Sequence, residues 1–200
     1  MNRQITTTAM LCALLFTGNA EAGPFGLEKG MPLEALGVPE SEISSGYYHY
    51  NTLPKPHSAF EAYVVQATPN QGVCWVKAIG VDVATDARGT QFVSAFEEMR
   101  SKLQRAYGSH DLTNGLPEDA VWTGAEDFMA SIYHDERIYL ADWGAAYGSE
   151  LEDNVVQIGL LAEATDYETG YYTVEYYFDN HELCDAETAA STSAAEDDAL

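Results

Sequence analysis

The sequence predicts an α+β fold: a mainly antiparallel sheet of about five to six strands, with one long and one or two short helices packed on one face. Strand-like segments follow one another along the chain instead of alternating with helices, which is typical of α+β proteins. One helical pattern stands out, over 90–107, where apolar residues recur at helical spacing. These residues are Phe92, Phe96, Met99, Leu103 and Ala106.

Six segments predict strands because they are rich in aromatic and β-branched residues and are bounded by turn residues. They are 47–50, 60–67, 73–83, 137–143, 155–164 and 171–178. A short helix is predicted after Pro32 and a second one over 125–134, while 110–124 is rich in turn residues.

The first 22 residues are typical of a secretory signal peptide. Arg3 provides the positive start, an apolar core spans 9–16, and Ala20-Glu21-Ala22 has the small-x-small pattern of a cleavage site. The apolar core is much shorter than the ~20 residues that cross a bilayer. We therefore predict cleavage between Ala22 and Gly23, no membrane span, and a periplasmic or secreted location.

Three regions follow from this interpretation: a signal peptide over 1–22, a single α+β domain over 23–184, and a disordered acidic tail over 185–200. The tail contains only small and acidic residues before Leu200. Such a composition cannot bury enough apolar surface to offset the entropy of ordering, which predicts a solvated segment.

Removal of the signal changes the cysteine count. Cys12 leaves with it, and Cys74 and Cys184 remain in a protein exported to a compartment where disulfides persist. The sequence therefore predicts an intramolecular disulfide between them. Two buried free thiols and an intermolecular bridge are the alternatives.

The chain is strongly acidic, with 9 Lys and Arg against 32 Asp and Glu and a formal net charge of −23. Arg3 and Glu21 leave together with the signal, so the mature charge is the same. Such a surface repels nucleic-acid phosphates and anionic membranes, which argues against both as partners. Solubility in a salty environment and a cationic partner remain as explanations.

No motif of catalysis or cofactor binding occurs. The sequence lacks His-Glu-x-x-His, Cys-x-x-Cys, a Gly-rich phosphate loop and Gly-x-Ser-x-Gly. The histidines, which lack ligand-like spacing, are His49, His57, His110, His134 and His181. We predict no catalytic residue, no cofactor and no metal ligand.

One acidic segment invites a calcium interpretation. Asp82, Thr85 and Asp86 precede the long helix, but they lack the spacing of a known calcium loop. Capping of that helix by Asp86 is the preferred interpretation.

The tyrosines of two predicted strands are the most suggestive feature for function. They are Tyr47, Tyr48, Tyr50, Tyr171, Tyr172, Tyr176 and Tyr177. Alternate residues of a strand face opposite sides, so some of these rings point outward unless helices cover both faces. Outward tyrosines suit a protein or glycan surface, whereas high strand propensity is the simpler explanation.

Three segments carry a resemblance: Phe25-Gly26-Leu27-Glu28-Lys29-Gly30-Met31, Pro54-Lys55-Pro56-His57 and the strand over 72–80. With them the chain resembles a family of small exported bacterial proteins of unknown function. The resemblance implies a bacterial origin and a periplasmic location, and it carries no catalytic residues that could be transferred to this chain.

The function these observations favour is a non-enzymatic binding or interaction domain whose partner is a protein or an envelope component. The alternatives are a hydrolase that uses carboxylates or calcium, and an acidic inhibitor of a basic enzyme.

Overall fold

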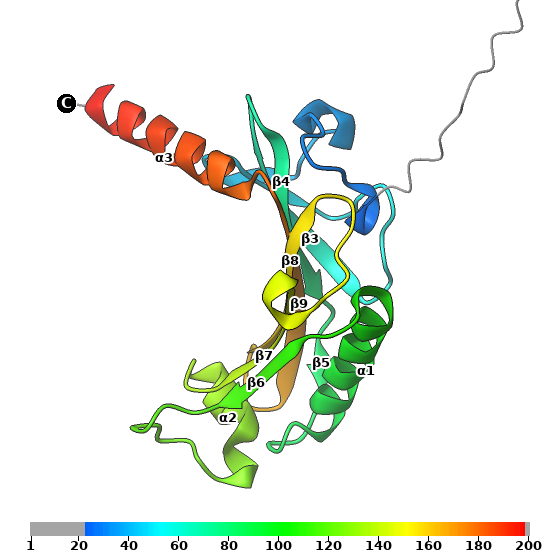
Figure 1. Ribbon diagram of the computed structural model, residues 1–200. Coiled ribbons are helices and arrows are strands. Elements are labelled where there is room, and N and C mark those ends of the chain that lie inside the picture. Colours follow the sequence, from blue (N-terminus) through cyan, green and yellow to red (C-terminus); the bar gives the residue numbers. More distant parts are fainter. Residues whose placement is uncertain (1–22, 199–200) are drawn as a thin grey trace, which may run out of the picture.

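A nine-stranded sheet dominates the computed structural model, which describes residues 23–198, and all its strand pairs are antiparallel (Figure 1). The strands are β1 (Ser41–Ser44), β2 (Tyr47–Tyr50), β3 (Phe60–Thr68), β4 (Gly72–Gly80), β5 (Val83–Ala84), β6 (Asp111–Gly115), β7 (Ile138–Gly144), β8 (Val155–Ala164) and β9 (Thr169–Phe178). Their order across the sheet is β1-β2-β3-β4-β9-β8-β7-β6, and β5 pairs with the start of β9. The predicted α+β class and the antiparallel sheet are confirmed.

The sheet is larger than the predicted five to six strands. The additional strands are β1 and β6 at its two edges and the two-residue β5. Every residue of β1 is exposed and so is nearly all of β6, so neither has the apolar alternation that identifies a half-buried strand. The single strand predicted over 73–83 is interrupted at Val81 and Asp82, between β4 and β5.

Three α-helices accompany the sheet: α1 (Thr90–Tyr107), α2 (Phe128–Tyr133) and α3 (His181–Asp198). Short 3-10 turns are η1 (Pro24–Gly26), η2 (Leu33–Leu36), η3 (Ala125–Asp127) and η4 (Ala145–Tyr147). Helix α1 has the predicted bounds and ends at Gly108, whose φ of 77° suits glycine. At its start, the Asp86 carboxylate accepts hydrogen bonds from the backbone N–H and the hydroxyl of Thr90, each at 2.9 Å. Asp86 therefore holds the helix start, as predicted.

The hydrophobic core lies between α1 and one face of the sheet. Its largest fully buried side chains include Trp143, Tyr63, Phe92, Phe96 and Phe178. The ring of Phe96 stacks on Tyr139 of β7, with 4.2 Å between ring centroids. Helix α1 runs along this face in Figure 1, which makes it the core side of the sheet.

The disulfide between Cys74 and Cys184 is present, as predicted, with an S–S distance of 2.00 Å. Both cysteines are fully buried. The bond attaches the first turn of α3 to β4. The predicted signal peptide over 1–22, with Cys12 and Ala22, lies outside the described residues.

The C-terminal segment differs from the predicted disordered tail, because α3 extends from His181 to Asp198. Its composition is rich in alanine, the strongest helix former, and Glu182 in the first turn favours the positive end of the helix dipole. The prediction considered only how little apolar surface this segment can bury. It also placed the helices on one face, whereas Asp185 of α3 accepts a hydrogen bond from Gln66 Nε2 at 2.8 Å on the side opposite α1.

Candidate functional site

The tyrosines of β2 and β9 divide between the two faces of the sheet. Directly opposed residues on neighbouring antiparallel strands point to the same side, so the registers assign each ring. The core side takes Tyr48, Tyr50, Tyr172 and Tyr176. The opposite side takes Tyr47, Tyr171 and Tyr177, which are half-buried. The sequence predicted such a division without assigning its members.

We call the side opposite α1 the open face and define it by three rows of registered residues. The first row is Tyr47, Gln66, Trp75, Tyr177 and Gln157. The second is His49, Val64, Lys77, Glu175, Gly159 and Asp142. The third is Ile79, Thr173, Leu161 and Leu140. Most of these side chains are half-buried, whereas their neighbours on the core side are buried.

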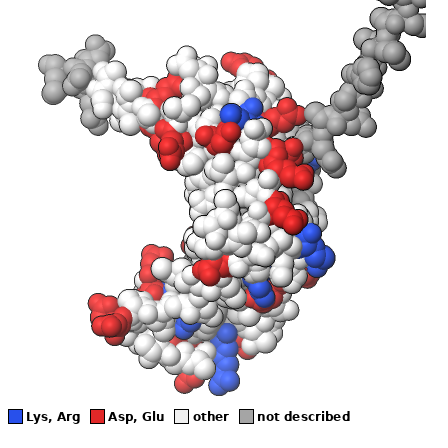
Figure 2. Space-filling view, viewed as in Figure 1, with Lys and Arg blue, Asp and Glu red and all other residues white. Residues whose placement is uncertain are grey.

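The open face is hollowed. Figure 2 shows a concave surface on the side away from α1, largely uncharged at its centre and with acidic groups above and below it. The first turn of α3 covers the β3 end of this face, where Gln66 is only 3% exposed. On this side of the sheet, the central strands β4, β9 and β8 remain accessible to solvent.

Glu175 organises the centre of the open face. Its carboxylate accepts hydrogen bonds from Trp75 Nε1 at 3.1 Å and from the Tyr177 hydroxyl at 2.7 Å. It also forms an ion pair with Lys77, with 3.1 Å between Nζ and Oε1. Burial and the Glu175 charge raise the pKa of Tyr177, so its hydroxyl stays protonated and donating. Their hydrogen bonds to Glu175 therefore fix the orientation of both aromatic rings.

A hollow of about 190 Å³ lies beside this centre. Its lining residues are Leu140, Asp142, Gln157, Gly159, Leu161, Glu175 and Tyr177. The missing side chain of Gly159 leaves the space open, and a Cβ at this position would lie 3.8 Å from Leu140 Cδ1, an ordinary contact. A substitution at Gly159 can therefore fill the hollow without disturbing the backbone.

The carboxyl groups around the open face do not form an evident acid–base pair. Burial raises the pKa of Glu163, while nearby Lys77 opposes that shift. The Glu175 carboxylate already interacts with three donor groups, those of Trp75, Tyr177 and Lys77. The Asp142 carboxylate accepts a hydrogen bond from Gln157 Nε2 at 3.1 Å.

The five histidines lie apart in the fold. Their places are β2 for His49, the loop before β3 for His57, the loop after α1 for His110, the end of α2 for His134 and the start of α3 for His181. Within residues 23–198 no group of three or more His, Cys, Asp or Glu is arranged to hold a metal ion. Neither is any helix of this part long and apolar enough to cross a membrane.

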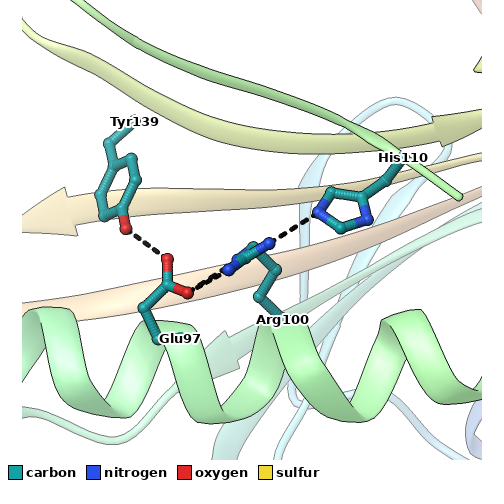
Figure 3. A network of polar contacts seen from close by, with 4 residues as sticks. All are labelled: Glu97, Arg100, His110 and Tyr139. Carbon is teal, nitrogen blue, oxygen red and sulfur yellow. Dashed lines mark hydrogen bonds and ion pairs between the residues drawn. The ribbon is translucent and has the colours of Figure 1, made fainter.

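A second polar cluster, which sequence patterns did not reveal, joins α1 to the sheet on the core side. Figure 3 shows Tyr139 and Arg100 meeting the carboxylate of Glu97, and His110 beyond Arg100. The Tyr139 hydroxyl donates to Glu97 Oε1 at 2.6 Å, Arg100 Nε donates to Glu97 Oε2 at 2.9 Å, and Arg100 Nη1 lies 2.9 Å from His110 Nε2. The His110 ring stacks on the buried Trp143, with 4.6 Å between centroids. These contacts connect α1 to β7 and to the loop after α1, so we call the cluster a structural clamp, although His110 Nδ1 is buried without a hydrogen-bond partner among the described residues.

The clamp makes stability depend on pH. Burial, and then the charge of Arg100, lower the pKa of His110 below its usual 6.5. As the pH falls below 6.5 the unfolded chain takes up the proton first, so the contribution of His110 to the free energy of unfolding decreases from pH 7 toward pH 5. The slope should stay below the ~1.4 kcal/mol per pH unit that one proton gives, because solvent screens the partly exposed ring.

Urea unfolding of the wild type and of His110→Gln at pH 5, 6 and 7 measures this effect. The variant should show a shallower decrease over the same range. Equal slopes for the two proteins would contradict the assignment to His110.

The chain matches no family model, no curated protein and no solved structure.

Proposed function

We propose that this is an exported, non-enzymatic binding protein, periplasmic or secreted, that takes a partner protein of the envelope on its open face. One observation carries the proposal: a sheet face on which Glu175 fixes Trp75 and Tyr177 next to a hollow, and whose central strands no other element of residues 23–198 covers. Aromatic residues held in place contribute most of the affinity of many interfaces. The buried disulfide and the signal-like N-terminal sequence support export.

The charge distribution indicates the chemistry of the partner. The polar groups of the two central rings, Trp75 Nε1 and the Tyr177 hydroxyl, already donate to Glu175. What these two residues offer to a partner is therefore mainly the apolar surface of their rings. Acidic groups lie above and below the concave surface in Figure 2, and the chain carries a formal net charge of −23. The partner that fits is a protein segment with apolar side chains at its centre and Lys or Arg at its ends. The same charges fit an inhibitor of a basic enzyme, which is one form of such a partner.

A photo-crosslinking pair tests the site. A benzophenone amino acid at position 171 lies on the open face, whereas one at position 38 replaces Val38, which follows η2 and is 93% exposed. Crosslinking in living cells should capture one protein from position 171 and not from position 38. Capture of the same protein from both positions, or of none from position 171, would contradict the proposal.

The captured partner then allows a direct measurement of affinity. Trp75→Ala and Gly159→Leu should each weaken binding about tenfold or more, the first by removing the central ring and the second by filling the hollow. Val38→Ser removes exposed apolar surface elsewhere and should bind like the wild type. Circular dichroism of each variant verifies folding. Unchanged affinity in both open-face variants would overturn the assignment of the site.

A further inference from the structure

A second aromatic cluster lies at the other end of the molecule from α3, where α2 meets the turn between β8 and β9. Tyr133 is the last residue of α2 and Tyr167 lies in the turn. Their rings are 5.3 Å apart between centroids and nearly perpendicular, at 86°. Both are exposed, at 45% and 46%, although rings of this size usually find cover. Two perpendicular exposed rings form a corner.

Neighbouring residues hold the Tyr167 ring in place. His134 Nε2 lies 2.9 Å from the Tyr167 hydroxyl, and the His134 ring stacks on Trp122 with 5.3 Å between centroids and an angle of 4°. The turn itself is fixed, since Glu168 N donates to Asp166 Oδ1 at 2.7 Å. These contacts position the Tyr167 ring, and the Tyr133 ring packs edge-on against Tyr167 and His134.

A hollow of about 500 Å³ opens at this corner. Its lining residues are Tyr133, Asp166, Tyr167, Glu168 and Thr169. Two carboxylates thus stand beside two aromatic rings, and no Lys or Arg lines the hollow. Arg137, a neighbouring cation in the sequence, is held elsewhere: its guanidinium lies 5.0 Å from the Phe128 ring centroid and its Nε bonds to Ser131.

We propose that this hollow binds a small organic cation, of the quaternary ammonium or alkylated amine class. The faces of aromatic rings carry negative potential and attract cations, most strongly where several rings converge. The carboxylates of Asp166 and Glu168 add charge attraction, and the lining offers no cationic donor for an anionic ligand. This site is distinct from the open face and does not depend on the function proposed for it.

Choline is the probe, and 3,3-dimethylbutan-1-ol is its uncharged counterpart of nearly the same shape. Calorimetric titration of the folded protein should show choline binding, with the alcohol at least tenfold weaker. Vesicles of phosphatidylcholine present the same cation on a lipid. Binding to these vesicles without binding to free choline would assign the site to a headgroup of the same chemistry.

Variants locate the binding. Tyr133→Ala and Tyr167→Ala should each weaken choline binding about tenfold, and Asp166→Asn should weaken it severalfold. Val38→Ser, which changes an exposed residue outside the lining of this hollow, should bind choline like the wild type. The proposal is overturned if neither choline nor the vesicles bind, if the alcohol binds as tightly as choline, or if both alanine variants retain full affinity.

Discussion

Replacing Cys74 and Cys184 together with alanine is expected to lower the free energy of unfolding by about 3–5 kcal/mol. The disulfide joins residues 110 positions apart, so its loss releases a long loop in the unfolded chain. Both cysteines are fully buried, and alanine adds no polar group that would need a partner. Urea unfolding under oxidising conditions measures the change.

A reductant provides the matched control. Dithiothreitol should destabilise the wild type by a similar amount and leave the double variant unaffected. Hydrogen exchange should then show faster exchange in α3, whose remaining attachments include the bonds of Glu187 to Thr68 at 2.7 Å and to Asn70 at 2.8 Å. A double variant as stable as the oxidised wild type would refute a stabilising role for the bond.

Phe96→Ala should destabilise the protein by about 3–5 kcal/mol, because it leaves a cavity between α1 and the sheet. The side chain is fully buried and stacks on Tyr139, which Glu97 also holds through a 2.6 Å hydrogen bond. Thermal and urea unfolding measure the loss.

Ser94→Ala serves as the control on the same helix, since Ser94 is exposed and its replacement should change stability by less than about 0.5 kcal/mol. A small effect of Phe96→Ala, comparable to that of Ser94→Ala, would show that α1 contributes little to the core. Both variants should leave the binding that we propose for the open face unchanged, because α1 covers the other side of the sheet.

The elements with one buried face were predictable from the sequence. Helix α1 was found with its bounds because its apolar residues repeat at helical spacing and Gly108 ends it. Strands β2, β3, β7, β8 and β9 were found within one to two residues at each end. The edge strands β1 and β6 were not predicted, because almost all their side chains are exposed. Such strands lack the alternation of apolar and polar residues by which a strand is identified from sequence.

The candidate sites were not predictable in the same way. The centre of the open face joins Trp75 to Glu175 and Tyr177, which are about a hundred positions away in the chain. Local spacing predicts that tyrosines alternate, but only the strand registers and the position of α1 decide which side is covered. The hollow at Tyr133 and Tyr167 likewise depends on a turn and a helix end that meet in space.

The place of β9 in the sheet has a consequence for when the protein can fold. This strand lies between β4 and β8, so it separates the first four strands from the rest, and it ends at Phe178, close to the C-terminus. A chain that has emerged only as far as β8 lacks the strand that joins the two halves. Contacts between residues so far apart in the sequence form late, and they make folding slower. The two halves of the sheet therefore cannot join until β9 is available to pair with both β4 and β8.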